Sequence, residues 1–419
     1  MKIPFNTPGR RWPVAILAVV IAVAYVGVVA SQYAAFRLGE RVELTSLKRA
    51  ARLDPGNADY RDRLGRYFDL VARDPAAAVA QYQEAVRLNP HSARYWFDLA
   101  SSYQVLGDTS GQTTALERAI RAEPTKPDVA WTAANFFLVQ GENDKALREF
   151  RVVLANDPTL AAAAIQLCWR MQADVDALLR DVVPPNNDAY LSFLGLLETR
   201  EETAGAAKVW NALLETHQPF ERRYADAYFR YLIQHKDIDQ AVLVWQQTAD
   251  RFGYSGYSLP SSGNLILNGS FNLDPLNAGF DWQYQKQAGV ELTLDPTEFH
   301  SGRRSLMITF DGPGISDAGI VHLVPVQPNT TYDFSAYYKT SEQLGAGGPH
   351  FTIQDMYSRA IYYESDELRD TGFWKSADGE FTTSPDCTLV VLHIRRLPER
   401  SPIRGKLWVD DFRLTRKPS

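Results

Sequence analysis

The chain has 419 residues, of which 45% are hydrophobic and 22% charged; this excludes an intrinsically disordered protein and supports a large core divided into two or three units. Its formal net charge of -6 gives no support for nucleic-acid binding, because that function needs a basic surface to displace counterions from phosphates. The two cysteines, Cys168 and Cys387, fall in different predicted domains, so buried free thiols are favoured over a disulfide or a metal site.

Residues 13–31 form an apolar segment without a charged residue. Its length suits the roughly 17 to 25 residues that a membrane-spanning helix needs. Basic residues precede it, which predicts that residues 1–12 stay in the cytoplasm and that the bulk of the chain lies in the periplasm or outside the cell. We therefore expect a single-pass anchor in the inner (cytoplasmic) membrane. A cleaved signal peptide stays open as the alternative, since Val28, Val29 and Ala30 are small residues of the kind that a signal peptidase reads.

Residues 32–252 contain a sequence repeat. A dipeptide that ends in proline recurs as Asp54-Pro55, Asn89-Pro90, Glu123-Pro124 and Asp157-Pro158, at spacings of 35, 34 and 34 residues. Such a period predicts stacked pairs of helices. Each proline should end the second helix of a pair, because proline lacks an N–H and clashes with the preceding turn. One inserted residue lengthens the turn near Asp74-Pro75.

The unit that ends at Pro124 resembles the tetratricopeptide repeat (TPR). Its first helix carries Trp96, Leu99, Ala100 and Tyr103 on one face, and Gly107 ends that helix. The resemblance implies an all-α solenoid whose concave groove, lined by the first helices, binds a protein partner. By offset from the consensus, the groove candidates are Arg94, Phe97, Ser101, Gln104, Trp131, Asn135 and Leu138. Packing of Phe97 and Trp131 against neighbouring repeats or the β domain stays open as the alternative.

Residues 253–263 are rich in Ser and Gly and carry no charge, which predicts a linker between domains. Beyond them the hydrophobic period changes from about 3.6 to about 2. Tyr332, Phe334 and Ala336 alternate with more polar residues, and two other segments alternate in the same way. Short alternating strands between turns predict a β-sandwich over residues 264–419. The predicted fold is thus multidomain, α then β: a transmembrane helix, an all-α TPR-like solenoid and a C-terminal β-sandwich.

The C-terminal domain resembles the jelly-roll carbohydrate-binding modules of the CBM4/9 (CenC-type) family, often found beside cellulases and xylanases. Four motifs carry the resemblance: the opening segment 264–271, the turn His300-Ser301-Gly302, the strand entry at 328–339 and the closing segment 407–412. A match of this kind identifies a fold more securely than an activity.

In that family, side chains on one sheet face stack on sugars and hydrogen-bond to them. The strand alternation leaves one set of residues facing outward, and these are the glycan candidates: Tyr337, Lys339, Thr352, Gln354, His393 and Arg395. A solvated polar face without a ligand stays open for this set. Trp282, Tyr284 and Trp408 are expected in the core, because large aromatic side chains of alternating strands usually fill the sandwich.

The same family often has a structural calcium ion near the opening and closing strands. Asp410 and Asp411 match its closing acidic pair, but Asn272 stands where an acidic residue is common, which lowers the charge available to a hard cation. The resemblance therefore implies at most a structural calcium on Asp410 and Asp411. No other cofactor is expected.

No catalytic constellation stands out in the sequence. Glu364, Asp366 and Glu367 lie in one polar stretch, whereas glycoside hydrolysis needs two carboxyl groups facing each other across a cleft, so we expect no enzyme activity. The combination favours a membrane-anchored scaffold whose solenoid binds a protein and whose sandwich binds a polysaccharide, in a system such as exopolysaccharide or O-antigen assembly and export. The alternative is a protein-interaction adaptor whose sandwich is structural and binds no sugar.

Overall fold

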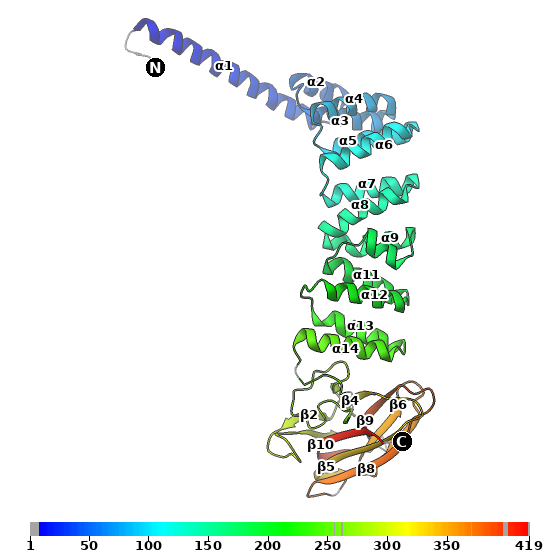
Figure 1. Ribbon diagram of the computed structural model, residues 1–419. Coiled ribbons are helices and arrows are strands. Elements are labelled where there is room, and N and C mark those ends of the chain that lie inside the picture. Colours follow the sequence, from blue (N-terminus) through cyan, green and yellow to red (C-terminus); the bar gives the residue numbers. More distant parts are fainter. Residues whose placement is uncertain (1–7, 255, 261–262, 370, 397–400, 418–419) are drawn as a thin grey trace. The chain divides into compact units, whose positions relative to one another are not determined.

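The computed structural model describes residues 8–254, 256–260, 263–369, 371–396 and 401–417. The chain divides into two compact units, one comprising Met1–Arg200 and Lys208–Gln218, the other Glu201–Ala207 and Pro219–Ser419. The first unit is helical, while the second combines the last helices of the chain with two β-sheets (Figure 1). This confirms the predicted fold class of helices followed by a β-sandwich.

Helix α1 (Pro8–Gly39) contains the predicted apolar segment. From Trp12 to Gly39 it is long and apolar enough to cross a membrane, with a mean hydropathy of 2.7, and a signal sequence would pass the same test. Residues 1–7 of the predicted N-terminal tail lie outside the described residues. Near its C-terminal end the helix joins the solenoid, because Ala35 is buried in a cluster with Leu47 and Tyr60. The end of α1 and helix α2 (Leu44–Leu53) thus begin the helical stack.

The following helices succeed one another along the chain in pairs (Figure 1). They are α3 (Ala58–Tyr67) with α4 (Pro75–Leu88), α5 (Ala93–Leu106) with α6 (Thr109–Ala122), α7 (Pro127–Gln140) with α8 (Asn143–Asn156), α9 (Ala161–Met171) with α10 (Val175–Asp181), α11 (Asn187–Thr199) with α12 (Thr203–Glu215), and α13 (Arg222–Gln234) with α14 (Ile238–Phe252). Helices α2, α4, α6 and α8 each end two residues before a repeat proline, as predicted. Gly107 and Gly141 end α5 and α7 with φ angles of 72° and 78°, a left-handed conformation that glycine adopts without strain.

The extra residue of the repeat that ends at Pro90 is accommodated directly after α3. Phe68–Ala72 forms a π-helical turn (η1), and Arg73 follows with a φ of 55°. A π-turn accommodates an extra residue within a continuous helix. Asp74 then caps α4, because its Oδ1 accepts the N–H of Ala77 at 3.0 Å. The insertion therefore appears as a bulge, and the next helix begins normally.

Helices α13 and α14 pack against the sandwich within the second unit. Phe280, which is fully buried, lies edge-on against Phe229 of α13 at a ring distance of 4.9 Å and against Trp245 of α14 at 6.4 Å. Gly279 permits this approach, since a Cβ there would lie 1.9 Å from the Trp245 ring. The segment 253–263, predicted as a linker, runs between these elements of one unit, and its Tyr257 is buried; residues 255, 261 and 262 of it lie outside the described residues.

In the described part of the C-terminal domain, the sandwich consists of two five-stranded antiparallel sheets. Sheet A has the order β1-β4-β9-β6-β7 and sheet B the order β2-β3-β10-β5-β8. The strands are β1 (Gln283–Tyr284), β2 (Val290–Asp295), β3 (Ser305–Gly312), β4 (Asp317–Pro325), β5 (Thr331–Gly345), β6 (Pro349–Asp355), β7 (Ile361–Glu364), β8 (Lys375–Thr382), β9 (Leu389–Arg396) and β10 (Ile403–Arg416). Residues of both sheets, Phe334, Phe351 and Phe412 among them, meet in a common hydrophobic core.

The three aromatic residues expected in the core differ in their positions. Trp282 is fully buried in the core, as predicted. The prediction for Tyr284 is wrong: it lies on the two-residue edge strand β1 and is 44% exposed. Trp408 is buried, but it alternates with the core residues Leu407 and Val409 and therefore lies on the outer face of sheet B.

The opening segment of the domain is fastened to the closing strand β10. Asn264 Nδ2 donates to the carbonyl of Phe412 at 2.9 Å, and Asn264 Oδ1 accepts the N–H of Leu414 at 2.9 Å. Gly269 lies so close to the carbonyl of Phe412 that a Cβ would stand 2.3 Å from it. The two terminal motifs of the predicted module therefore occur together because they are direct neighbours in space.

Candidate functional site

Four of the six glycan candidates lie together on the outer face of sheet A. In β9, Leu392 and Ile394 enter the core, so His393 and Arg395 face outward. In the neighbouring strand β6, Thr352 lies directly opposite His393. Gln354 is two residues further along β6 and shares this face. These four residues therefore share one face of the sheet, which we call the sheet A face; Thr352 and Gln354 are buried there, and His393 and Arg395 are partly exposed.

A chain of hydrogen bonds orders the sheet A face. His393 Nδ1 donates to Asp317 Oδ2 at 3.1 Å, and Gln354 Nε2 donates to His393 Nε2 at 3.3 Å. The two contacts agree, because a neutral imidazole protonated on Nδ1 has its acceptor on Nε2. Asp317 therefore fixes the tautomer and orientation of His393, and His393 in turn orients the amide of Gln354.

Thr352 and Arg395 differ in how a ligand would reach them. Thr352 is fully buried, and its hydroxyl has no hydrogen-bond partner among the described residues. Arg395 is partly exposed and lies between Asp317 and His350 in cross-strand register, and its guanidinium makes no ion pair or hydrogen bond with a described residue. Since a guanidinium has five N–H donors in a fixed plane, Arg395 is the group of this face that is most available to an incoming acceptor.

Tyr337 and Lys339 lie on the other sheet. Both belong to β5 and face outward from sheet B. The imidazole of His300 is stacked on the Tyr337 ring at a centroid distance of 3.6 Å, and Lys339 Nζ lies 2.7 Å from Glu298 Oε2. The loop between β2 and β3 thus covers one face of Tyr337 and pairs the charge of Lys339. The six glycan candidates are therefore two separate surfaces.

Asp410 and Asp411, the calcium candidates, are surrounded by donors of the protein. The carboxylate of Asp410 accepts the N–H groups of His300, Ser301 and Asp411, and that of Asp411 accepts the hydroxyls of Ser270 and Ser301 and Nδ1–H of His300. Burial raises the pKa of Asp410 to about 6. Burial alone would raise the pKa of Asp411 as well, but hydrogen bonds from Ser301 and His300 outweigh it, and the pKa of Asp411 is lowered.

These residues do not fit a calcium ion as they stand. Calcium takes roughly six to eight oxygen ligands, whereas all four carboxylate oxygens here already accept hydrogen bonds from N–H or O–H groups. Across the described ranges, no group of three or more His, Cys, Asp or Glu side chains could hold a metal ion.

The groove candidate Arg94 belongs to an ion-pair network between two repeats. Its guanidinium lies 2.7 Å from Asp59 and 2.9 Å from Asp62, both on α3. Asp62 is fully buried, and burial together with the neighbouring Asp98 raises its pKa to about 7. Arg66 pairs with Asp98 at 2.8 Å, which links α3 to α5 a second time. Arg94 thus has a role in holding repeats together before any partner is considered.

The aromatic groove candidates are used in packing. Phe97 is stacked on Phe136 of the next repeat at 6.1 Å, and Trp131 lies edge-on against Phe150 of its own helix pair at 5.5 Å. Phe97 therefore follows the alternative of packing against a neighbouring repeat. Of the other candidates, Ser101 and Gln104 are exposed, while Asn135 and Leu138 are partly buried.

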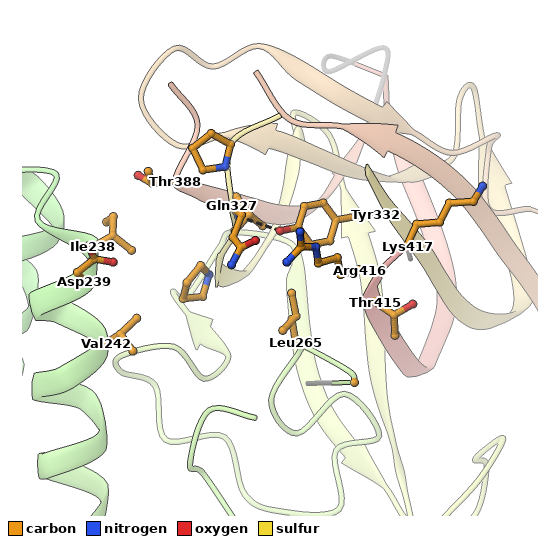
Figure 2. A pocket seen from close by; sticks show the side chains of 14 residues that line it. Ile238, Asp239, Val242, Leu265, Gln327, Tyr332, Thr388, Thr415, Arg416 and Lys417 are labelled. Atoms are coloured by element: carbon orange, nitrogen blue, oxygen red, sulfur yellow. Dashed lines mark hydrogen bonds between the residues drawn. The ribbon is translucent and has the colours of Figure 1, made fainter. Parts of the chain in front are cut away.

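A pocket of about 750 Å³ lies between α14 and one end of the sandwich (Figure 2). Ile238 and Val242 line it from the helix, and Gln327, Tyr332 and Arg416 line it from the β domain. None of the predicted glycan candidates is among its lining residues. The pocket exists because a helix pair packs on the sandwich, an arrangement for which the sequence carries no signal.

Residues 263–396 match the family model described as a carbohydrate binding domain. The C-terminal domain is a two-sheet β-sandwich that is similar to carbohydrate-binding modules. This confirms the resemblance for the β part of the chain, while the paired helices confirm the TPR-like architecture of the α part.

Solved structures that are similar to parts of the chain include a xylan-binding domain and the proteins MamA and PilF. The CBM22-1 xylan-binding domain from Paenibacillus barcinonensis Xyn10C is 15% identical over 38% of this chain and 99% of that chain, with a TM-score of 0.28. MamA is 20% identical over 41% of this chain and 85% of that chain, with a TM-score of 0.26. PilF of Pseudomonas aeruginosa is 17% identical over 55% of this chain and 95% of that chain, with a TM-score of 0.27. No curated protein matches the sequence.

Proposed function

We propose that the chain is a membrane-anchored, non-enzymatic scaffold that holds a glycan on the sheet A face and a protein partner on its helical repeats. A carbohydrate binding domain next to TPR-like helix pairs supports a binding or scaffold role. The apolar helix α1 supports an anchor in the cytoplasmic membrane with the bulk of the chain in the periplasm. Exopolysaccharide or O-antigen assembly and export is the kind of system that such a pairing would serve.

The observation that carries the glycan half is the ordered polar group of the sheet A face, in which His393 and Arg395 are partly exposed and Gln354 is buried behind them. Sugar hydroxyls must find both donors and acceptors once water is removed. Gln354 and His393 are held in one orientation by Asp317, and Arg395 adds donors without a competing partner among the described residues. Pre-oriented groups lose less conformational entropy on binding, so this surface suits a hydroxyl-rich ligand.

The carboxylate of Asp317 helps to order this face, since it accepts Nδ1–H of His393 and, at 2.7 Å, the N–H of Gly319. A hydrolytic role would require a second carboxyl group facing it across the sugar at a defined distance. We therefore assign Asp317 the role of positioning His393.

The test compares two matched double variants of the full-length chain, purified in detergent and run in affinity gels with neutral and acidic polysaccharides. His393→Ala with Gln354→Ala removes the sheet A face, and Tyr337→Ala with Lys339→Ala removes the equivalent residues of sheet B. We expect the first variant to lose retardation and the second to keep it, with unchanged circular dichroism in both.

The outcomes separate the alternatives. Loss of retardation only in the sheet B variant would move the glycan to the other sheet. No retardation of the unaltered chain by any polysaccharide would leave the adaptor with a purely structural sandwich as the function.

A further inference from the structure

Three exposed aliphatic side chains recur at one position of successive repeats. Leu70, Val105 and Val139 are 35 and 34 residues apart, the same spacings as the repeat prolines. Leu70 lies in the π-turn directly after α3, and Val105 and Val139 lie near the C-terminal ends of α5 and α7; their exposed fractions are 77%, 72% and 73%. A single exposed apolar residue is ordinary, but the same exposure at three equivalent positions indicates a contact surface.

The helices that carry these side chains are neighbours within the first unit. Ser102 Oγ donates to Asp69 Oδ2 at 2.6 Å, which joins α5 to the π-turn η1 beside Leu70 and one helical turn from Val105. The stacked rings of Phe97 and Phe136 join α5 to α7. The three side chains therefore follow one edge of the solenoid, which we call the aliphatic edge.

The π-turn enlarges this edge. It presents Val71 as well as Leu70 to solvent, with an exposed fraction of 56%, and Leu106 beside Val105 is 46% exposed. Single π-turns within helices are frequent at functional sites, because they hold side chains in positions that a regular helix would not offer.

Carboxylates accompany the aliphatic edge. The residues that cap the second helices are Asp74, Asp108 and Glu142, three or four positions after each edge residue, and all are exposed. In Asp74 and Asp108, Oδ1 accepts a backbone N–H of the helix, while Oδ2 makes no hydrogen bond to a described residue. Arg73 is a basic residue in the first of these turns, and Glu142 is paired with Lys145 of α8 at 3.5 Å. The edge is therefore apolar with an acidic border.

We propose that the aliphatic edge docks a basic amphipathic segment of a protein partner. Aliphatic side chains of that segment would cover Leu70, Val105 and Val139, and its Lys or Arg residues would meet Asp74, Asp108 and Glu142. The inference rests on the proposed function, in which the repeats bind a protein, and it gives that partner a surface and a chemistry. An anionic lipid surface does not suit the acidic border, because like charges repel.

The test uses the full-length chain in phosphatidylcholine nanodiscs and three fluorescent model peptides of about 18 residues, or five helical turns. One peptide has a leucine face and a lysine face, the second replaces lysine by glutamate, and the third replaces leucine by serine. We expect the leucine/lysine peptide to bind and the other two to bind at least about tenfold more weakly, since both the apolar and the charged contact are needed.

Variants locate the contact. Val105→Ser with Val139→Ser should weaken the leucine/lysine peptide about tenfold, whereas Leu243→Ser, a similar change at a 41% exposed site on α14, should not. Asp108→Asn with Glu142→Gln removes two charges from the edge, while the asparagine can still cap the helix at position 108. This variant should reduce the salt dependence of binding. Circular dichroism of each variant verifies folding, and the charge variants test the edge independently of the valine pair.

Three results would overturn the inference: no binding of the leucine/lysine peptide, equal binding of the leucine/glutamate peptide, or full binding by the Val105→Ser, Val139→Ser variant. If Ser101→Ala with Gln104→Ala abolishes peptide binding while the edge variants keep it, the partner lies in the concave groove. The proposed function would then stand and the edge would not.

Discussion

Tyr357, in the loop after β6, donates a hydrogen bond of 2.7 Å from its Oη to the carbonyl of Ile233 near the end of α13. Lys236 lies over the same ring, 5.1 Å from its centroid. Burial, with the nearby charge of Asp355, raises the pKa of the Tyr357 phenol to about 12, so the hydroxyl keeps its proton and remains a donor at every physiological pH. Together with the Phe280 contacts, this bond makes the last helix pair an integral part of the second unit, which we call the β unit.

The Phe280→Ala substitution should destabilise the second unit by about 3–5 kcal/mol, because it empties a fully buried ring position between two helices and the sandwich. Urea unfolding of the full-length chain, followed by tryptophan fluorescence, measures this, since Trp245 lies at the same contact. Phe373→Ala removes the same ring from a 65% exposed site and should change the free energy of unfolding by no more than about 0.5 kcal/mol. Equal urea midpoints for the two variants would mean that packing of the helix pair does not contribute to the stability of the second unit.

Calcium should not stabilise the chain. All four oxygens of Asp410 and Asp411 already accept hydrogen bonds, so an ion would have to displace several of them. We expect thermal unfolding in excess calcium and in chelator to coincide, whereas a site filled at 100 times its dissociation constant would add about 2.7 kcal/mol. A chelator-dependent fall of several degrees would show that the donors rearrange to admit the ion.

The periodic parts of the fold could be predicted from the sequence. The proline spacing located the ends of α2, α4, α6 and α8, because a helix cannot pass through these prolines without losing hydrogen bonds. The alternation in β5 likewise placed Tyr332, Phe334 and Ala336 in the core. Both signals are local, and each is repeated enough to be read without knowing what the element packs against.

The candidate sites depend on pairing between distant segments, which local patterns do not encode. Alternation indicated that both Tyr337 and His393 face outward, but it could not show that their strands belong to different sheets. Asp317, which holds His393, was missed because a register shift between Asp317 and Val321 interrupts the pattern of β4. The two residues are 76 positions apart in the chain.

The contribution of His322 to the stability of the sandwich and its two packed helices should fall as the pH is lowered. This imidazole is fully buried beside Trp282, its Nδ1 has no hydrogen-bond partner among the described residues, and burial lowers its pKa to about 4. In the unfolded chain a histidine binds a proton near pH 6.5. Between these values this histidine binds more protons in the unfolded state than in the folded state, so its contribution to the free energy of unfolding decreases from pH 6.5 towards pH 4, by roughly 3 kcal/mol in total.

Two buried carboxyls act in the opposite direction and require a variant for comparison. Burial raises the pKa of Asp281 and of Asp410 to about 6, so each is protonated in the folded state first and opposes the loss as the pH falls. The measurement is therefore the difference between the unaltered chain and His322→Gln in urea unfolding at pH 7 and pH 4.5. Over this interval the free energy of unfolding of the unaltered chain should fall relative to that of the variant, because only the unaltered chain has to keep the buried imidazole of His322 uncharged. Parallel losses in the two proteins would show that His322 is protonated in the folded state at little cost.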